Sequence, residues 1–341
     1  MRALVYLGPG RMELQDAPDP QPGRGEVVIA SKASAICGSD LHGFREASPR
    51  RIPPLVMGHE TVGVIDATGE GVDPSLAGHR VVLKPIVACG VCDECRAGDI
   101  NHCAAGRLVG RDLPGGFAER FVVPASAAVP IPSDLSDDLA TLTEPLANAV
   151  HVASRGVRSG DRVFVIGAGP IGVLMARAAL LFGAAEVHVT DPVAGRLRLA
   201  EAQGAVALDA GDDAAEAVRE ATGGRGPDLV IDAAGFEATW ALGLRAVRTG
   251  GRIVQVGLGA ASGSLDYFAV LGKEATITGS YAWTDDDFAR ALELLADGEL
   301  DATGWITRMP LEDGQRAFEE LTGGDPARFK IVLEMDMRAE A

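Results

Sequence analysis

The middle of the chain alternates short apolar, β-branched runs with longer segments of helical spacing. Residues 163–166 form the first such run, and residues 173–182 carry the first helical pattern. Further strand-like runs lie at 186–190, 228–234 and 252–257. Strands that alternate with helices in this way predict a doubly wound parallel sheet of the α/β class.

The N-terminal part of the chain has a different pattern. Residues 2–7, 26–30 and 61–67 are apolar or alternating, and proline-rich turns separate the first two of these segments. This pattern predicts the strands of an antiparallel barrel. With 341 residues, the chain is long enough for two domains of these two kinds.

A glycine-rich turn joins the first strand of the parallel sheet to the first helix. It consists of Gly167, Ala168, Gly169, Pro170, Ile171 and Gly172. Gly167 permits the tight turn, Gly169 lets backbone amides approach a pyrophosphate, and Gly172 lets helix and strand pack closely. The start of the helix offers unpaired N–H groups to the phosphates. The turn therefore predicts a dinucleotide-binding site.

Asp191 ends the second strand, close to the spacing at which a carboxylate meets the adenosine ribose. Its oxygens can accept hydrogen bonds from a free 2′-hydroxyl, and its charge repels a 2′-phosphate. Pro192 follows it, with no Arg or Lys directly after. The sequence therefore predicts NAD rather than NADP.

Charge and composition exclude several classes of partner. A formal net charge of −17 argues against nucleic acid and against anionic membrane surfaces. The start of the chain has no signal-peptide pattern, and no apolar run approaches the ~20 residues of a membrane span. We therefore expect a cytoplasmic protein whose five cysteines are reduced and serve as metal ligands or nucleophiles.

Four of the cysteines lie in one short segment, separated by two, two and seven residues. They are Cys89, Cys92, Cys95 and Cys103. Four thiolates at this spacing suit a closed tetrahedral zinc site, which is structural because no coordination position is open. A ferredoxin-like iron–sulfur site, a zinc ribbon for nucleic acid and disulfides are the alternatives. The acidic charge disfavours the ribbon, and a reducing compartment disfavours the disulfides.

A second group of candidate ligands is formed by Cys37, His59 and Glu60. Three protein ligands and a vacant fourth position are what a catalytic zinc requires. Neighbours on an extended strand point to opposite faces, so His59 and Glu60 share a metal only if Gly58 bends the chain. Glu144, just ahead of a predicted helix, is a rival third ligand.

Taken together, these motifs resemble those of the zinc-containing medium-chain alcohol dehydrogenases. Within that family they are similar to the polyol branch, which contains sorbitol, threonine and sugar-phosphate dehydrogenases. The motifs stand in the family's order and cover nearly the whole chain. They are Cys37-Gly38-Ser39-Asp40-Leu41-His42, Gly58-His59-Glu60, the four-cysteine segment, Glu144-Pro145-Leu146-Ala147 and the glycine-rich turn.

The resemblance implies a catalytic domain with a GroES-like antiparallel β-barrel, split between residues 1–147 and 282–341. It implies a zinc lobe at residues 88–104 within this domain. Residues 148–281 would then form a six-stranded Rossmann domain that binds NAD.

The resemblance also implies roles at the catalytic metal. Cys37 and His59 would bind zinc, and Glu60 or Glu144 would complete the shell, directly or through water. Ser39 would relay the proton of the substrate, and His42 would either carry it further outward or only cap and pack.

Further roles concern the cofactor. The backbone around Val256 and Ser280 would hold the nicotinamide carboxamide. Arg196 would flank the adenine, and Lys330 would lie near the pyrophosphate.

The chain departs from the sorbitol enzymes at two positions. Gly43 stands where those enzymes have a tyrosine beside the substrate, and Ser280 stands where they have an arginine. Both changes remove contacts to a polyol, so sorbitol itself is not expected as the substrate. Arg45, Arg50 and Arg51 either form an anion site for a phosphorylated or acidic substrate or are solvated surface residues, and the second interpretation is favoured.

The predicted activity is the reversible oxidation of a secondary alcohol to a ketone with zinc and NAD. A polyol, a cyclitol, an amino alcohol and a sugar phosphate all remain candidate substrates. The alternatives are a zinc-free NAD(P)H-dependent reductase of the same superfamily and a non-enzymatic NAD(H)-binding protein. The expected partners are a small alcohol and further copies of the chain, as a homodimer or homotetramer.

Overall fold

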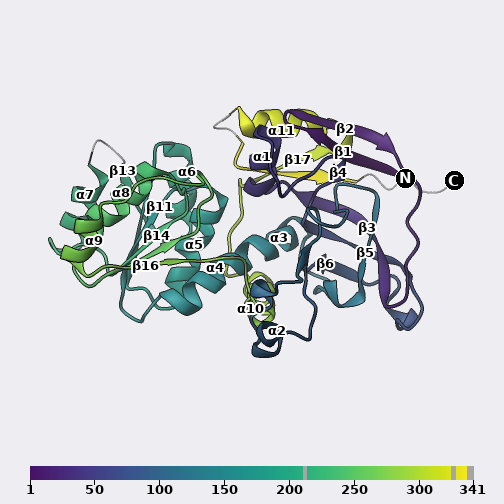
Figure 1. The fold of residues 1–341 in the computed structure, drawn as a ribbon, viewed down its shortest axis with the longest axis horizontal. Helices are drawn as coiled ribbons and strands as arrows, with labels where there is room; N and C mark the ends of the chain where they lie inside the picture. The colour runs from purple at the N-terminus through teal and green to yellow at the C-terminus, as the bar shows by residue number, and fades with distance from the viewer. Residues whose placement is uncertain (210–212, 324–327, 336–341) are drawn as a thin grey trace. The chain divides into compact units, whose positions relative to one another are not determined.

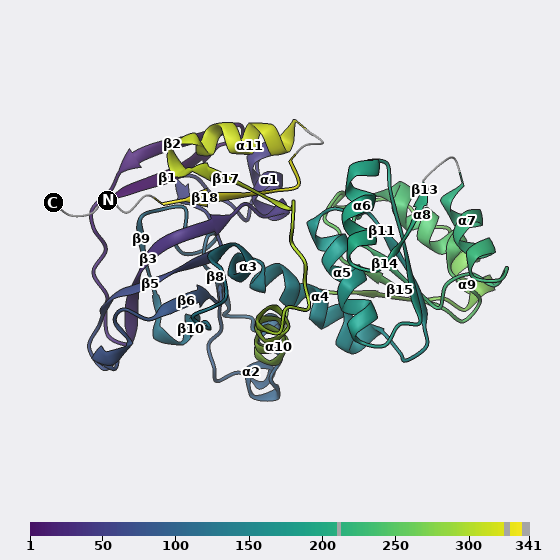
Figure 2. The same cartoon turned by 180° about the vertical axis from the view of Figure 1, so that it is seen from behind.

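The computed structural model describes residues 1–209, 213–323 and 328–335, and the chain forms two compact units. Unit 1 contains Met1–Glu144 and Thr284–Ala341, and unit 2 contains Pro145–Trp283. Figures 1 and 2 show the elements of both units from opposite sides. The domain limits expected after residues 147 and 281 stay a prediction, because a boundary of contacts does not show where a domain folds by itself.

Unit 2 is built on a six-stranded sheet with the order β13-β12-β11-β14-β15-β16. Every neighbouring pair is parallel. The strands are β11 (Arg162–Ile166), β12 (Glu186–Asp191), β13 (Val206–Asp209), β14 (Leu229–Asp232), β15 (Arg252–Gln255) and β16 (Thr276–Gly279). Its helices are α5 (Pro170–Leu181), α6 (Ala194–Ala202), α7 (Ala214–Ala221), α8 (Glu237–Ala246), α9 (Tyr267–Lys273) and all but the first two residues of α4 (Thr143–Gly156). The predicted doubly wound parallel sheet is confirmed.

Helices cover both faces of this sheet (Figure 1). Phe164 and Val230 of the sheet pack in one buried cluster with Val218 of α7 and Leu244 of α8. Helix α5 contacts β11 and β12. Residues 163–166 of β11 and all of β14 are buried, and strands that are buried on both faces carry continuous apolar runs and not alternating ones.

Unit 1 contains a seven-stranded sheet with the order β10-β6-β5-β3-β18-β17, in which β9 also pairs with β3, and two smaller sheets, β2-β1-β4 and β7-β8. Its strands are β1 (Arg2–Gly8), β2 (Arg11–Asp16), β3 (Glu26–Ala35), β4 (Leu55–Val56), β5 (Glu60–Thr68), β6 (Arg80–Leu83), β7 (Ile86–Val87), β8 (Arg107–Leu108), β9 (Arg120–Pro124), β10 (Ala128–Pro130), β17 (Ile306–Pro310) and β18 (Lys330–Glu334). Its helices are α1 (Gly38–Arg45), α2 (Asp93–Ala97), α3 (Asp137–Thr141), α10 (Asp285–Ala296) and α11 (Gly314–Thr322).

The antiparallel pairing expected for unit 1 holds except between β17 and β18, which are parallel. Helix α11 lies between them in the chain, and a crossover of this length returns a strand in the same direction. Among the described residues, no helix has both the length and the apolar character that crossing a bilayer requires.

A core cluster in unit 1 fixes helix α1, which carries part of the candidate metal site. Phe44 of α1 packs on Phe318 of α11 at a ring distance of 5.1 Å, and Phe318 packs on Phe117 at 5.9 Å. All three are buried with Leu4 and Leu333 in one cluster. Full burial of such a side chain contributes about 1.5–3 kcal/mol relative to exposure, so this cluster anchors α1 firmly.

Candidate metal and cofactor sites

Cys37 lies between β3 and α1, where it is the N-cap residue of the helix. Its backbone N–H donates to Asp40 Oδ2 at 3.2 Å, as in a capping box. Asp40 is fully buried, and its Oδ1 lies 3.5 Å from His59 Nδ1. Asp40 therefore connects two of the candidate ligands.

The chain bends at Gly58, directly before His59 and Glu60. Gly58 has φ +98°, and a Cβ at this position would lie 2.7 Å from the Phe117 backbone nitrogen, so only glycine fits without a shift. The sulfur of Cys37, a ring nitrogen of His59 and a carboxylate oxygen of Glu60 all lie within 4.8 Å of one another. The structure thus brings Glu60 as well as its chain neighbour His59 to the candidate metal site.

Two further charged residues lie at this site. Glu144 is buried in the first turn of α4 and raises the pKa of Glu60, but it is not part of the described group of three ligands. Lys330 is buried on β18, with its Nζ 2.5 Å from Glu60 Oε2. A role for Lys330 at the pyrophosphate stays a prediction, and the contact that the structure shows is with Glu60.

Burial and neighbouring charges shift the titration of the site. Burial raises the pKa of Glu60 and Glu144 adds to this, so the pKa is raised although Lys330 and His59 oppose the shift. Burial alone would lower the pKa of His59, but Asp40 and Cys37 outweigh it and raise that pKa well above its usual value. For Asp40, burial would raise the pKa, but His59 and a nearby arginine hold it far below its usual range.

The donor set fits a divalent metal ion. Glu60 Oε1 is buried and has no hydrogen-bond partner among the described residues, and such an unmet group costs about 1–3 kcal/mol. A cation held by Cys37, His59 and Glu60 would satisfy that oxygen and balance the thiolate and the carboxylate. One thiolate, one imidazole and one carboxylate are also ligand types that zinc accepts.

The two predicted relay residues differ in their surroundings. Ser39 is half-buried, and its Oγ donates to Cys37 Sγ at 3.4 Å. His42 lies nearly one helical turn further along α1 and is exposed. Because no described hydrogen bond joins Ser39 to His42, a relay between them stays a prediction.

Two residues that contact this group, Asp40 and Arg51, were not predicted from the sequence to do so. Asp40 was recoverable, because an acidic residue three positions after an N-cap is the pattern of a capping box. Arg51 was expected at the surface with Arg45 and Arg50, which are exposed, but it is buried against Asp40. No local pattern marks it, since its partners come from another element.

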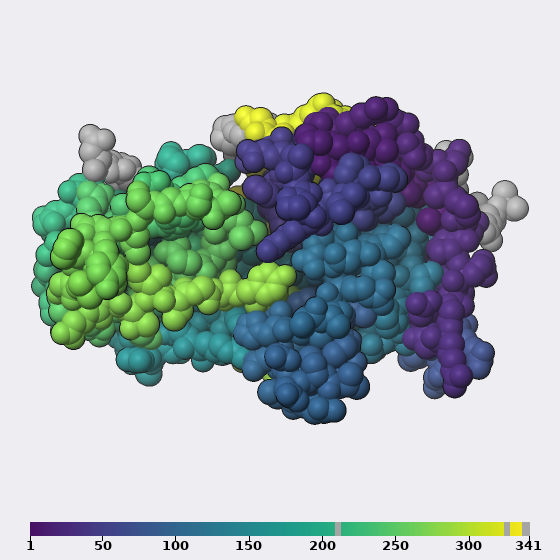
Figure 3. Space-filling view, in the orientation of Figure 1, coloured from purple at the N-terminus to yellow at the C-terminus, as the bar shows by residue number. Residues whose placement is uncertain are grey.

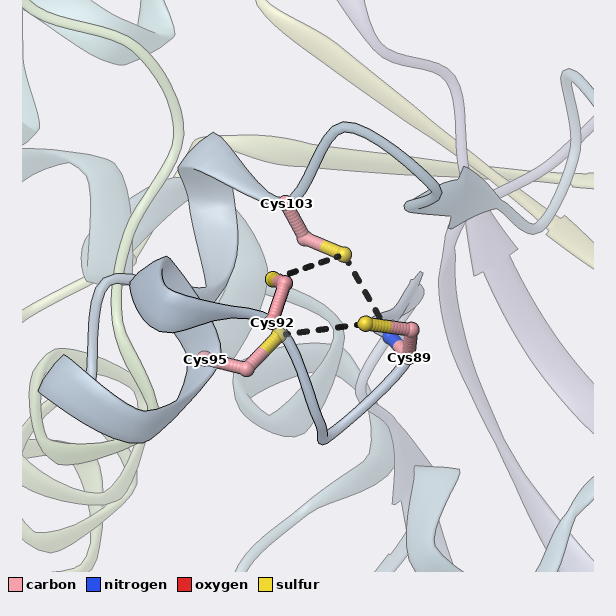
Figure 4. A group of neighbouring side chains, drawn as sticks. All are labelled: Cys89, Cys92, Cys95 and Cys103. Carbon is pink, nitrogen blue, oxygen red and sulfur yellow. Dashed lines mark hydrogen bonds between the residues drawn. The ribbon is translucent and has the colours of Figure 1, made fainter.

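The remaining four cysteines converge in a lobe around α2 (Figure 4), the blue segment at the lower edge of Figure 3. The sulfur atoms of Cys89 and Cys95 lie 3.9 Å apart, and those of Cys92 and Cys103 lie 3.8 Å apart. Four zinc–sulfur bonds of about 2.3 Å in a tetrahedron place the sulfurs about 3.8 Å apart. A disulfide needs about 2.05 Å, and an iron–sulfur cluster spreads its thiolates over several irons. All four lie within 4.8 Å of one another, so a single tetrahedral zinc fits best.

The glycine-rich turn has the geometry that the sequence predicts for a phosphate-binding turn. Gly167 has φ +96°, and a Cβ at Gly172 would lie 1.8 Å from the Gly167 carbonyl oxygen, so both must be glycine. A Cβ at Gly169 would meet nothing within 4 Å, which leaves the backbone open to a ligand. Pro170 begins α5, where a missing N–H costs nothing, and Ile171 follows in its first turn.

Asp191 ends β12 beside this turn. Its Oδ2 accepts a hydrogen bond from the Ala168 N–H and its Oδ1 from the Val193 N–H, both at 2.8 Å. Arg196 Nη1 lies 3.8 Å from the same carboxylate. The carboxylate is therefore held at the mouth of the turn, where the ribose of a dinucleotide is expected.

Val256 and Ser280 follow β15 and β16, two neighbouring parallel strands. The Ser280 N–H donates to the Gln255 carbonyl at 2.9 Å, so the two positions lie together at the carboxyl edge of the sheet. This is the edge at which Gly167 leaves β11, as expected for residues that bind one dinucleotide. Their contact with a nicotinamide stays a prediction.

Comparisons with known proteins give consistent matches. An alcohol dehydrogenase GroES-like domain matches residues 23–133, and a zinc-binding dehydrogenase domain matches residues 170–297. The L-threonine 3-dehydrogenase of Pectobacterium carotovorum is 35% identical over 345 residues, covering 99% of this chain and 100% of the relative.

Solved structures are similar over the same extent. A protein of Escherichia coli CFT073 described as a short chain alcohol dehydrogenase, complexed with NADH, superposes with a TM-score of 0.91 at 30% identity, over 98% of this chain and 99% of that one. Galactitol-1-phosphate dehydrogenase of Escherichia coli gives a TM-score of 0.89 at 26% identity, over 98% and 100%.

Proposed function

This chain belongs to the zinc-containing medium-chain alcohol dehydrogenase family and is a zinc-dependent alcohol oxidoreductase, and we propose that it oxidises a secondary alcohol to a ketone with NAD. The observation that carries this proposal is the convergence of Cys37, His59 and Glu60 within 4.8 Å in a site that stays partly open at Cys37. We take these three as the protein ligands of the catalytic zinc, with Glu60 rather than Glu144 as the third.

Each side chain then has a defined task. A zinc ion held there supplies a Lewis acid that makes the hydroxyl of an alcohol more acidic. Cys37 and Glu60 moderate the charge of the metal, and Lys330 holds Glu60 in place. Ser39 would accept the hydroxyl proton of the alcohol and release its own, and NAD, when bound, would supply the acceptor for the hydride that leaves the alcohol carbon.

Asp191 supports NAD over NADP as the cofactor. Both of its oxygens accept hydrogen bonds from backbone N–H groups, so its charge is fixed next to the glycine-rich turn. A fixed carboxylate repels a 2′-phosphate and can accept a bond from a 2′-hydroxyl.

We propose a small polar alcohol as the substrate, either an amino alcohol of the threonine type or a polyol phosphate. The L-threonine 3-dehydrogenase and galactitol-1-phosphate dehydrogenase relatives support these two classes. The absent side chain at Gly43 argues against sorbitol. A screen of NAD reduction over L-threonine, polyols, cyclitols and sugar phosphates tests the proposal, and no turnover of any of them would contradict it.

The variant Cys37→Ala tests the site assignment. We expect it to abolish turnover, to lower the zinc content from two ions per chain to one, and to leave NADH binding unchanged. NADH fluorescence is the internal control for folding. Full activity of this variant would rule out the zinc scheme, and wild-type protein with no zinc at Cys37 would favour the zinc-free reductase.

A homodimer through unit 2 is a further part of the proposal. Helix α9 has no buried residue, and its Tyr267 and Phe268 are 69% and 82% exposed. The next element of the chain, β16, is the last strand in the order of the sheet. Exposed aromatic side chains and terminal sheet strands are both typical of an interface. Light scattering after chromatography tests this: Phe268→Asp should yield monomer, whereas a monomeric wild-type protein would contradict the proposal.

A further inference from the structure

Arg51 is a buried cation next to the candidate metal site. Its side chain is 8% exposed, and its Nη2 donates to Asp40 Oδ1 at 2.8 Å. Asp40 is fully buried, and its other oxygen accepts the bond from Cys37. The Nε of Arg51 is buried without a hydrogen-bond partner among the described residues. A buried guanidinium N–H without a hydrogen-bond partner lowers the stability of the folded protein. This cost indicates that Arg51 has a role other than stabilising the fold.

The stem of Arg51 reaches Asp40 by crossing α1 at Gly43. A Cβ at Gly43 would lie 2.5 Å from Arg51 Cδ, so any other residue would push the arginine aside. Glycine is otherwise disfavoured inside a helix. The carbonyl of Gly43 accepts a hydrogen bond from the Tyr6 hydroxyl at 2.8 Å, which holds α1 at this point. Gly43 therefore leaves the room that Arg51 fills.

The same nitrogen of Arg51 also donates to Ser39 Oγ at 3.0 Å. A guanidinium can only donate, whereas a hydroxyl has one proton and two lone pairs. The hydrogen bond from Arg51 therefore occupies one lone pair of the Ser39 oxygen, and the hydroxyl proton of Ser39 points away from Arg51. In the structure that proton is directed to Cys37 Sγ. One lone pair of Ser39 is left to accept a further proton.

From this geometry we infer that Arg51 is a positioning residue for proton transfer, which holds the Ser39 oxygen ready to accept the hydroxyl proton of the alcohol. The inference rests on the proposed function, in which Ser39 takes that proton and gives up its own, which the half-buried hydroxyl releases to solvent when its O–H turns away from Cys37. Arg51 comes from the loop between α1 and β4, so the reaction centre depends on a segment that carries none of the metal ligands. Gly43 serves the reaction only through Arg51.

The test compares Arg51→Met, Arg51→Lys and Gly43→Ala with the control Arg50→Met, whose side chain is exposed. Zinc-loaded proteins are assayed with NAD and the best alcohol from the screen. For Arg51→Met we expect kcat to fall at least about 10-fold while KM for the alcohol changes less than about 3-fold, because the lost group orients a proton acceptor and does not bind substrate.

The other variants and the pH profile refine this expectation. The acidic limb of the kcat profile should move to higher pH in Arg51→Met, because a positive charge beside Ser39 favours loss of the alcohol proton. Arg51→Lys should regain part of kcat, since an ammonium still donates. Gly43→Ala should change kcat and the profile in the same direction as Arg51→Met but less, and Arg50→Met should match wild type.

Zinc content and the visible spectrum of the cobalt-substituted protein report the ligand geometry without turnover. We expect two metal ions per chain and an unchanged spectrum in every variant. Wild-type kcat and profile in Arg51→Met would overturn the inference, and so would a loss of kcat that only follows a loss of metal. If Arg51→Met does not fold, Arg51→Lys and Gly43→Ala decide in the same way. A wild-type protein that oxidises no alcohol would instead overturn the proposed function, and this role with it.

Discussion

The ion pair between Lys330 and Glu60 allows a sharp test of what burial does to a charge. The perturbation is Lys330→Met, which keeps the volume of the side chain and removes its charge. Both partners are almost fully buried, and their charged atoms lie 2.5 Å apart. Loss of the ammonium leaves the Glu60 carboxylate beside Glu144 without its closest cation.

A second lysine provides the matched control. Lys84 Nζ lies 2.6 Å from Asp285 Oδ1, so the pair has nearly the same length, but the side chains are 19% and 54% exposed. Breaking a buried pair by removal of one partner costs about 3–5 kcal/mol, whereas an exposed pair contributes about 0–1 kcal/mol. Because His59 and a bound zinc ion stay near Glu60, we expect the lower end, about 3 kcal/mol.

For a unit of about 200 residues, 1 kcal/mol corresponds to about 2–4 °C in Tm. Calorimetry of the zinc-loaded proteins should therefore show a fall of about 6–12 °C for Lys330→Met and at most about 4 °C for Lys84→Met. If the two single variants lose the same Tm, the argument from burial is wrong.

Three further predictions concern the cofactor, the zinc lobe and pH. Asp191→Asn removes the negative charge and keeps one side-chain oxygen that can accept a hydrogen bond from a backbone N–H. The ratio of kcat/KM for NADP to kcat/KM for NAD should therefore rise at least about 10-fold. An unchanged ratio would contradict the role of this carboxylate. Cys103→Ser should lower bound zinc by one ion per chain, as measured by atomic emission, whereas two ions in this variant would contradict a four-thiolate site. Burial would raise the pKa of Asp228, but the Arg162 N–H and the Arg248 side chain outweigh it and lower that pKa. Stability from Asp228 is therefore present above its unfolded pKa of about 3.9 and lost as the pH falls through the lower folded value. Tm measured between pH 6 and pH 2.5 should decline less in Asp228→Asn than in wild type, and equal declines would refute this.

The parts of the candidate site whose geometry agrees with the sequence-based prediction each lie within a short stretch of the chain. The glycine-rich turn, Asp191 and the four cysteines each depend on residues a short distance apart, and their spacing alone fixes which backbone and side-chain atoms meet. The choice between Glu60 and Glu144 was open because it depends on the bend at Gly58. The structure shows this bend, at which Phe117 packs closely against Gly58.

Contacts between distant segments were beyond the reach of any local pattern. Lys330 lies in the last described segment of the chain, residues 328–335, yet its ammonium meets Glu60 on β5. Arg51 was expected in water, because an arginine in a polar loop carries no sign of burial. It is buried because Gly43 leaves a gap and Asp40 supplies a compensating charge.

The sequence by itself therefore determined the class of fold, the dinucleotide turn and the kinds of ligand that are present. Periodicity and short spacings are local properties, and they survive in the folded state whatever packs around them. The tertiary structure decided which carboxylate lies within 4.8 Å of Cys37 and His59 and which cation lies beside that carboxylate. Those choices follow from the energy of burying charge, and burial is set only when segments far apart in the chain come together.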